Sequence, residues 1–116
     1  MQVKNMTRGY VLADRLRVAD TVWSRMRGLL GYPPLRPGEG LWICPSQGVH
    51  TLGMRYPIDV LFLNRYGRVI YLYEDLAPLR FTKIRFGAKS IIELPVNSIS
   101  QSRTHIGDQI AIGESP

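Results

Sequence analysis

The apolar run at residues 58–63, with the sequence IDVLFL, constrains the fold more than any other part of the chain. Side chains alternate along a strand, so apolar residues fall on both faces of this one. A strand that is apolar on both faces predicts a central position in a sheet that is covered on both sides. The exception is Asp59, the second residue of the run. Burying a carboxylate alone costs several kcal/mol, so Asp59 must either face water or find a partner.

The same strand, extended to residue 64, runs into the sequence NRYG, which is typical of a hairpin connection. Gly67 can supply the positive φ that such a turn requires. Residues 68–73, RVIYLY, then return as the antiparallel neighbour. Further short strands are predicted from apolar or alternating runs at residues 10–18, 41–44, 49–56, 90–94 and 109–112.

One helix is predicted between residues 20 and 30, and Asp20 or Thr21 can cap its start. Its apolar side chains fall on one stripe at spacings i, i+4, i+7 and i+8, formed by Val22, Met26, Leu29 and Leu30. This stripe predicts that the helix packs on the core. Gly31 is placed to end the helix in a left-handed conformation, and the prolines that follow prevent its continuation. A second short helical turn is predicted at residues 95–102.

These elements predict an α+β fold that is mainly β, with one or two short helices. Few connections reach the dozen or more residues that a parallel crossover needs. We therefore expect an antiparallel sheet curled into a small partial barrel, with the helices packed at its open ends. The length of 116 residues predicts a single domain that spans residues 1–116.

The formal net charge of +6 is compatible with an anionic partner. The basic residues are scattered, however, without a block of five or six like charges, which favours a solvated surface over a nucleic-acid footprint. A single cysteine cannot form an internal disulfide. The chain has no apolar run of about 18 residues that could span a membrane and no secretory h-region, so we expect a cytoplasmic location.

Candidate ligand-binding residues gather around Asp59. His50, Thr51 and Arg55 precede it in the sequence, and an Asp–Arg or Asp–His pair would offset the cost of desolvating its carboxylate. We expect a polar pocket at this place, rimmed by tyrosine and arginine side chains. The full set of candidates is His50, Thr51, Arg55, Tyr56, Asp59, Arg27 and Cys44.

Each candidate also has a plainer structural interpretation. Asp59 can accept backbone N–H bonds at the start of its strand and lock the turn around Pro57. His50 is more often a satisfied packing residue than a metal ligand. Cys44 can be a small buried apolar residue, since a nucleophilic role requires a partner base and a lowered pKa.

Several motifs of cofactor and enzyme sites are absent from the sequence. Cys44 and His50 match no zinc module, and with Asp59 they would make only a thin metal site. The glycines fit neither nucleotide-binding spacing, and no Gly-x-Ser-x-Gly elbow occurs. The acids are too dispersed to nominate a paired-carboxylate hydrolase. We therefore predict no metal and no cofactor.

The chain resembles a known family along most of its length. The resemblance is carried, in order, by VADTVWSRMRGLLG at 18–31, GEGLWICP at 38–45, HTLGMRYPIDVLFLNRYGRV at 50–69, SIIELP at 90–95 and HIGDQIAI at 105–112. These landmarks, within about residues 16–112, resemble domain of unknown function 192, a group of small bacterial and archaeal proteins. Its motif positions map onto Arg27, Gly28, Leu29, Pro57, Asp59, Gly107 and Asp108. The resemblance implies a compact, mainly β fold with short helices and implies no particular activity.

One stretch departs from the commonest form of that family, which has F-W-M-K-N-T before the proline. Here the six residues before Pro57 are VHTLGM, without the family's Lys or Asn. The stretch is similar to a subgroup with His-Thr-x-x-Met at this place, usually preceded by a cysteine such as Cys44. Any ligand preference that the Lys and Asn carry does not transfer to this chain.

Three functional hypotheses follow from the sequence. The first is a non-catalytic accessory module that binds a small polar ligand or a protein partner in a pocket around His50 and Asp59. The second is a hydrolase or metal-dependent enzyme, with His50 as general base, Asp59 as its orienter and Cys44 as nucleophile. The third is a nucleic-acid or anionic-surface binder, which steeply salt-dependent binding would reveal.

Overall fold

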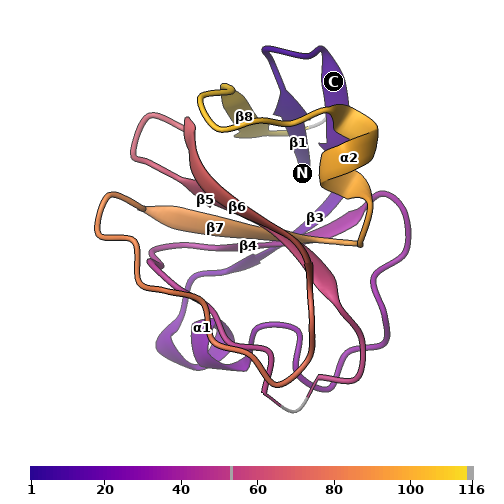
Figure 1. Cartoon of the computed structure of the whole chain (residues 1–116), viewed down its shortest axis with the longest axis vertical. Helices are drawn as coiled ribbons and strands as arrows, with labels where there is room; N and C mark the ends of the chain where they lie inside the picture. Colours follow the sequence, from indigo (N-terminus) through magenta and orange to yellow (C-terminus); the bar gives the residue numbers. More distant parts are fainter. Residues whose placement is uncertain (53, 115–116) are drawn as a thin grey trace.

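The computed structural model describes residues 1–52 and 54–114 (Figure 1). Within this part of the chain the protein is mainly β, with two short helices, α1 (Val22–Arg27) and α2 (Ser98–Ser102). The strands are β1 (Gln2–Asn5), β2 (Tyr10–Ala13), β3 (Arg15–Ala19), β4 (Glu39–Ile43), β5 (Ile58–Leu63), β6 (Val69–Leu76), β7 (Ser90–Leu94) and β8 (Ile110–Gly113). They form a three-stranded sheet in the order β2-β1-β8 and a five-stranded sheet in the order β3-β4-β7-β5-β6.

The hairpin and the central strand predicted from the sequence are confirmed. Strands β5 and β6 pair antiparallel, and β5 lies between β7 and β6 with all six of its residues buried. In the turn, Gly67 has a φ of 81°. The side-chain oxygen of Asn64 accepts hydrogen bonds from the backbone N–H groups of Tyr66 and Arg68, each at 2.9 Å. The central position that we predicted for this strand, from its apolar residues on both faces, is therefore confirmed.

The predicted antiparallel partial barrel is wrong. The strands form two sheets, neither of them closed nor strongly curled, and β3 pairs parallel to β4. The connection at residues 20–38 is long enough for a parallel crossover and contains α1. The strand predicted at residues 10–18 is divided between the two sheets. The backbone N–H groups of Asp14 and Arg15 both donate to Gly38 O, at 3.0 and 2.9 Å, where the chain leaves one sheet for the other.

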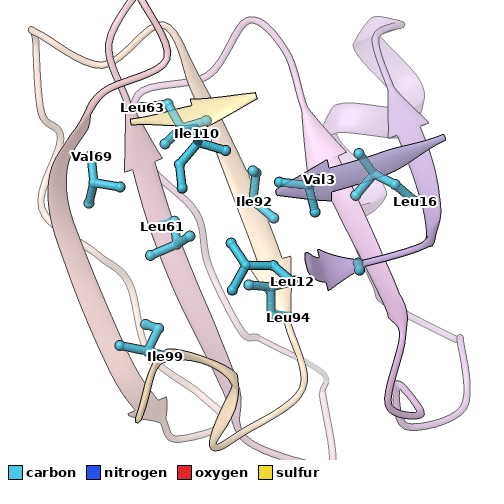
Figure 2. Close-up of a cluster of buried hydrophobic side chains, with 11 residues drawn as sticks. Val3, Leu12, Leu16, Leu61, Leu63, Val69, Ile92, Leu94, Ile99 and Ile110 are labelled. Carbon is cyan, nitrogen blue, oxygen red and sulfur yellow. The ribbon is translucent and has the colours of Figure 1, made fainter. Parts of the chain in front are cut away.

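A first hydrophobic core fills the space between the two sheets and α2 (Figure 2). Strands of both sheets contribute to it, and Ile99 of α2 closes one end. Its buried residues are Val3, Leu12, Ala13, Leu16, Leu61, Leu63, Val69, Ile92, Leu94, Ile99 and Ile110. The small sheet thus covers one face of the large sheet, which explains why β5 is buried on that side.

A second core lies on the opposite face of the large sheet. Its buried residues are Ala19, Leu29, Leu41, Ile43, Met54, Ile58, Val60, Phe62, Ala88 and Ile91. Side chains from the loops at residues 29–35 and 49–56 pack against it. This face is therefore covered mainly by irregular chain segments.

The prediction that α1 packs on the core through an apolar stripe is wrong. Thr21 does cap the helix, in a capping box with Ser24, but no residue of α1 is buried. The helix ends at Gly28, whose φ is 53°, so the buried Leu29 follows the helix and does not belong to its face. No helix in the described residues is long and apolar enough to cross a membrane.

The strand predicted at residues 49–56 is also wrong, as far as this segment is described; residue 53 lies outside the described residues. The segment pairs only through an isolated bridge between His50 and Phe81. The side chain of Thr51 bonds to the backbone of the loop at residues 77–80, which favours a turn over a continuous ladder. By contrast, the strands predicted at 41–44, 90–94 and 109–112 and the helical turn at 95–102 are confirmed within a few residues.

Candidate functional site

Asp59 is buried on the face of the large sheet that carries the first core, and only 1% of its surface is exposed. Its Oδ1 accepts a hydrogen bond from the backbone N–H of Asp75 on β6, and its Oδ2 accepts one from Ile99 of α2, both at 2.9 Å. Burial raises the pKa of Asp59, and these two bonds oppose that rise. The carboxylate therefore joins β5 to a left-handed residue in β6 and to the first turn of α2.

This arrangement matches the structural interpretation of Asp59, with backbone donors from β6 and α2 in place of the turn around Pro57. Among the described residues, Asp59 has no hydrogen bond or ion pair with His50, Thr51 or Arg55. The structure does not bring these four candidates together.

Thr51 is fully buried and fixes the loop that follows β6. Its Oγ1 donates to Ala77 O at 2.7 Å and accepts from the backbone N–H of Arg80 at 2.8 Å. Its backbone groups also pair with this loop, through Arg80 O and the N–H of Leu79. The threonine of the His-Thr pattern is thus a structural anchor for residues 77–80.

His50 and Cys44 lie apart from the Asp59 carboxylate. The imidazole of His50 lies beside the ring of Phe81, with centroids 6.2 Å apart, and its Nδ1 is buried without a hydrogen-bond partner in the described chain. Cys44 is half-buried, and its backbone N–H donates to Ala19 O at 3.1 Å. Among the described residues, no group of three His, Cys, Asp or Glu side chains is arranged to hold a metal ion.

An open cleft of about 720 Å³ does bring two of the candidates together, on the side of the second core. The segment after α1 forms one wall and Met54 to Tyr56 form the other. Its lining residues are Leu29, Leu30, Gly31, Tyr32, Pro33, Pro34, Met54, Arg55 and Tyr56. Arg55 and Tyr56 were candidates from the sequence, and the Tyr56 hydroxyl donates to Pro33 O at 3.3 Å across the cleft.

Two arginines contact the aromatic wall of this cleft. The guanidinium carbon of Arg17 lies 4.6 Å from the centre of the Tyr32 ring, and that of Arg27 lies 4.3 Å from it. The ion pairs within the described residues are Arg8–Asp108 and Asp14–Arg15, so neither of these arginines, nor Arg55, pairs with a carboxylate there. Arg55 thus lines the cleft and Arg17 and Arg27 contact its Tyr32 wall, and we call these three residues the arginine rim.

Glu93 is buried beneath this region, with 2% of its surface exposed. Cross-strand pairing places one row of side chains on the same face of the sheet: Arg17, Leu41, Glu93 and Val60. Glu93 Oε1 lies 3.7 Å from the position that a Cβ on Gly28 would take, and Oε2 has no hydrogen-bond partner in the described part of the chain. Burial raises the pKa of Glu93 to about 8.

Tyr56 is close enough to respond to this carboxyl group. Burial raises the pKa of the Tyr56 phenol, the charge of Glu93 raises it further, and Arg17 opposes both. Glu93 and Tyr56 thus form one electrostatic cluster with the arginine rim.

Sequence reasoning missed Glu93, Arg17 and Tyr32 as parts of a site. A signal for Glu93 was available, because SIIEL places an acid inside an apolar strand just as IDVLFL does for Asp59. Arg17 and Tyr32 carried no comparable signal. Their contact depends on the crossover between β3 and β4, which local sequence patterns did not reveal.

The fold and the cleft define a small, mainly β protein with an arginine-rimmed cleft on one face of a five-stranded sheet. The chain belongs to the family DUF192, described as Uncharacterized ACR, whose sequence profile matches residues 3–112. The resemblance seen in the sequence is thereby confirmed.

Two relatives agree with this assignment, and a solved structure has a similar fold. The chain is 37% identical over 111 residues to a UPF0127 protein of Thermococcus sibiricus, covering 91% of this chain and 71% of that protein. It is 32% identical over 111 residues to a UPF0127 protein of Pyrococcus furiosus, covering 91% and 93%. A crystal structure of a protein of unknown function from Novosphingobium aromaticivorans has a TM-score of 0.81 at 18% identity, covering 96% of this chain and 82% of that one. This last likeness concerns the fold alone.

Proposed function

We propose that this protein is a non-catalytic binding module whose cleft takes a small organic anion. The proposal keeps Arg27, Arg55 and Tyr56 from the residues that the sequence nominated. It replaces Asp59, whose two oxygens already accept backbone hydrogen bonds, with the arginine rim and Glu93.

The observation that carries the proposal is the pair of guanidinium groups over Tyr32, which have no carboxylate partner among the described residues. Guanidinium groups bind carboxylates and phosphates through paired, charge-assisted hydrogen bonds. The ring of Tyr32 restricts where Arg17 and Arg27 can lie, which lowers the entropy that binding would cost. An anion with a flat or apolar body suits such a rim above an apolar floor.

The size and charge of the cleft support the same ligand class. A volume of about 720 Å³ lies within the range of small-molecule sites. With a pKa of about 8, Glu93 is mostly protonated at pH 7 and adds little negative charge beneath the arginines. An anion therefore meets a net positive field there at neutral pH.

The hydrolase hypothesis has less support. It requires Asp59 to orient His50, and the hydrogen bonds of Asp59 go to Asp75 and Ile99 instead. We do not propose a catalytic role for Cys44 on a half-buried thiol alone.

The test is a thermal-melt screen of the wild-type protein with dicarboxylates and phosphate monoesters, each beside its neutral amide or alcohol analogue. Hits are then titrated by calorimetry. We expect Arg27→Gln to weaken binding of an anionic hit at least tenfold, or about 1.4 kcal/mol. Arg65→Gln is the matched control, because Arg65 also lies over a tyrosine, Tyr66 at 4.8 Å, but in the β5–β6 turn.

Three results would count against the cleft as an anion site. Neutral analogues could bind as tightly as the anions, or Arg27→Gln could bind a hit as well as Arg65→Gln does. Loss of binding in His50→Ala with full binding in Arg27→Gln would move the site to the loop around His50.

At pH 9, where Glu93 is ionised, we expect weaker anion binding by the wild type but not by Glu93→Gln.

A further inference from the structure

We propose that the end of the molecule formed by α1 and the loop at residues 79–89 docks on an anionic lipid bilayer. None of the apolar residues of this surface lines the ligand cleft, although Arg27 and Arg55 lie near both, and the inference does not depend on the proposed function. It begins from two large aromatic side chains that the fold leaves in solvent: Trp23 is 74% exposed and Phe86 is 84% exposed.

Trp23 and Phe86 belong to a larger set of exposed apolar residues on these two segments. The set comprises Val22, Trp23, Met26, Leu79, Phe81, Ile84 and Phe86. None of them is needed to fill either hydrophobic core. We name this set the apolar surface. Monomeric proteins rarely expose so many large apolar side chains together without a binding role.

The two segments lie side by side. A recess of about 500 Å³ has Val22 and Met26 on one side and Ala88 and Lys89 on the other. The segment at residues 45–47 connects them, because Arg25 donates to Pro45 O at 3.1 Å and the Gln47 side chain donates to Phe86 O at 3.0 Å. Figure 1 shows α1 and this loop at the end of the molecule remote from β1, β8 and α2.

The charge of this end is predominantly basic, with Asp20 just before the cap of α1 as an exception. Residues 21–38 contain Arg25, Arg27 and Arg36 and no acid, and residues 76–92 contain Arg80, Lys83, Arg85 and Lys89 and no acid. Residues 40–58, which connect the two parts of the surface, contain Arg55 and no acid either. An apolar surface surrounded by lysine and arginine is complementary to a membrane that carries anionic headgroups.

The shape of the surface favours a bilayer over a protein partner. Its most exposed side chains come from different segments, Trp23 from a short helix and Phe86 from a loop. A protein partner would need a separate pocket for each of them, whereas the headgroup region of a bilayer accepts projecting side chains of any arrangement. Tryptophan is also among the residues that prefer this interface, where the polar edge of its ring remains hydrated.

The test uses the full chain in flotation with phosphatidylcholine vesicles, with and without phosphatidylglycerol. We expect the wild type to bind the vesicles that contain phosphatidylglycerol, more weakly as salt is added, and to bind those of phosphatidylcholine alone at least tenfold more weakly. Trp23→Ser combined with Phe86→Ser should reduce binding at least tenfold. The matched control is Tyr66→Ser combined with Ile106→Ser, two exposed apolar residues elsewhere on the surface.

A charge variant and a fluorescence measurement complete the test. Lys83→Glu with Lys89→Glu should reduce binding at least tenfold, whereas Lys4→Glu with Arg65→Glu should change it little. Vesicles should shift the emission of the wild type to shorter wavelength, and Trp23→Phe should abolish that shift while Trp42 remains. Unchanged melting temperatures show that the exposed-residue variants remain folded.

The proposal is overturned if the wild type does not float with phosphatidylglycerol vesicles at low salt. It is also overturned if the Trp23→Ser, Phe86→Ser variant binds these vesicles as well as the Tyr66→Ser, Ile106→Ser control does. Binding to polyglutamate in place of vesicles would indicate an acidic protein partner and would also overturn it.

Discussion

At the scale of single residues, the protein handles two buried carboxyl groups in opposite ways. Asp59 and Glu93 lie on opposite faces of the same large sheet. Asp59 has a backbone N–H for each oxygen, and these bonds oppose the rise in its pKa that burial causes. Glu93 has an unpartnered oxygen, and its pKa rises to about 8. The backbone bonds of Asp59 give it a structural role, whereas the structure gives Glu93 no hydrogen-bond partner for Oε2 among the described residues.

Replacing Asp59 should reveal its structural role. In Asp59→Asn the amide nitrogen cannot accept a hydrogen bond, so either Asp75 N–H or Ile99 N–H loses its partner. We expect a loss of about 2 kcal/mol in the free energy of unfolding, measured by urea denaturation. Asp75→Asn should cost less than about 0.5 kcal/mol, because Asp75 is exposed with a φ of 53° that asparagine tolerates. Equal midpoints for the two variants would contradict the role given to Asp59.

At the scale of elements, the two helices are stabilised by different means. Helix α2 buries Ile99 and Ser102, and Asp59 on β5 binds its first turn. Helix α1 buries none of its residues and is held by its Thr21–Ser24 capping box. Since an isolated helix of this length is unstable in water, α1 depends on its cap and on the chain segments at its two ends.

Removing the cap of α1 should therefore act locally. We expect Thr21→Ala to weaken α1 by about 1 kcal/mol, seen as faster hydrogen exchange at the amides of Arg25 and Gly28. The global melting temperature should change little, because no core side chain is lost. Ile99→Ala in α2 should instead destabilise the whole protein by about 2–4 kcal/mol. A comparable drop in melting temperature for Thr21→Ala would show that α1 is part of the cooperative core.

At the scale of the whole molecule, the large sheet separates two different environments. One face joins the small sheet through the first core, and Asp108 fixes the neighbouring chain segments. Burial alone would raise the pKa of Asp108, but hydrogen bonds from Arg8, Asn5 and the His105 N–H, with the charge of Arg8, lower it to about 2. The other face carries the second core, the cleft and the basic, apolar end of the molecule. The small sheet and the candidate binding surfaces thus lie on opposite sides of the large sheet.

The unfavourable burial of Glu93 should make the stability of the whole protein depend on pH. The pKa of about 8 in the folded protein exceeds the ordinary value of 4.5, so the folded state holds this proton more tightly. Protonated Glu93 therefore adds to the free energy of unfolding. This contribution is fully present below pH 4.5, declines as pH rises and is lost above about pH 8. We expect Glu93→Gln to remove this decline, so that its free energy of unfolding relative to that of the wild type rises by several kcal/mol between about pH 5 and pH 9.

Urea denaturation at intervals from pH 5 to about 9 measures this dependence. Glu74→Gln, a change at an exposed residue of β6, is the control and should follow the wild type. Parallel pH profiles for Glu93→Gln and the wild type would mean that Glu93 ionises normally in the folded protein.

The sequence alone determined those features that depend on neighbouring residues. The apolar run at residues 58–63 and the turn residues after it predicted the β5–β6 hairpin, Asp20 or Thr21 marked the start of α1, and the ordered landmarks indicated the family. These signals are local, because side-chain alternation, turn residues and helix caps act within a few positions.

Only the tertiary structure decided which residues meet. Asp59 was correctly identified as a carboxylate that needs partners, but those partners are backbone groups 16 and 40 positions away. The parallel pairing of β3 with β4 placed Arg17 over Tyr32, and the end of α1 at Gly28 left its apolar residues in solvent. Each outcome depends on contacts between segments that are distant in the sequence. The free energy of these contacts exceeds the local conformational preferences of the residues, and the contacts leave no pattern in the neighbouring sequence.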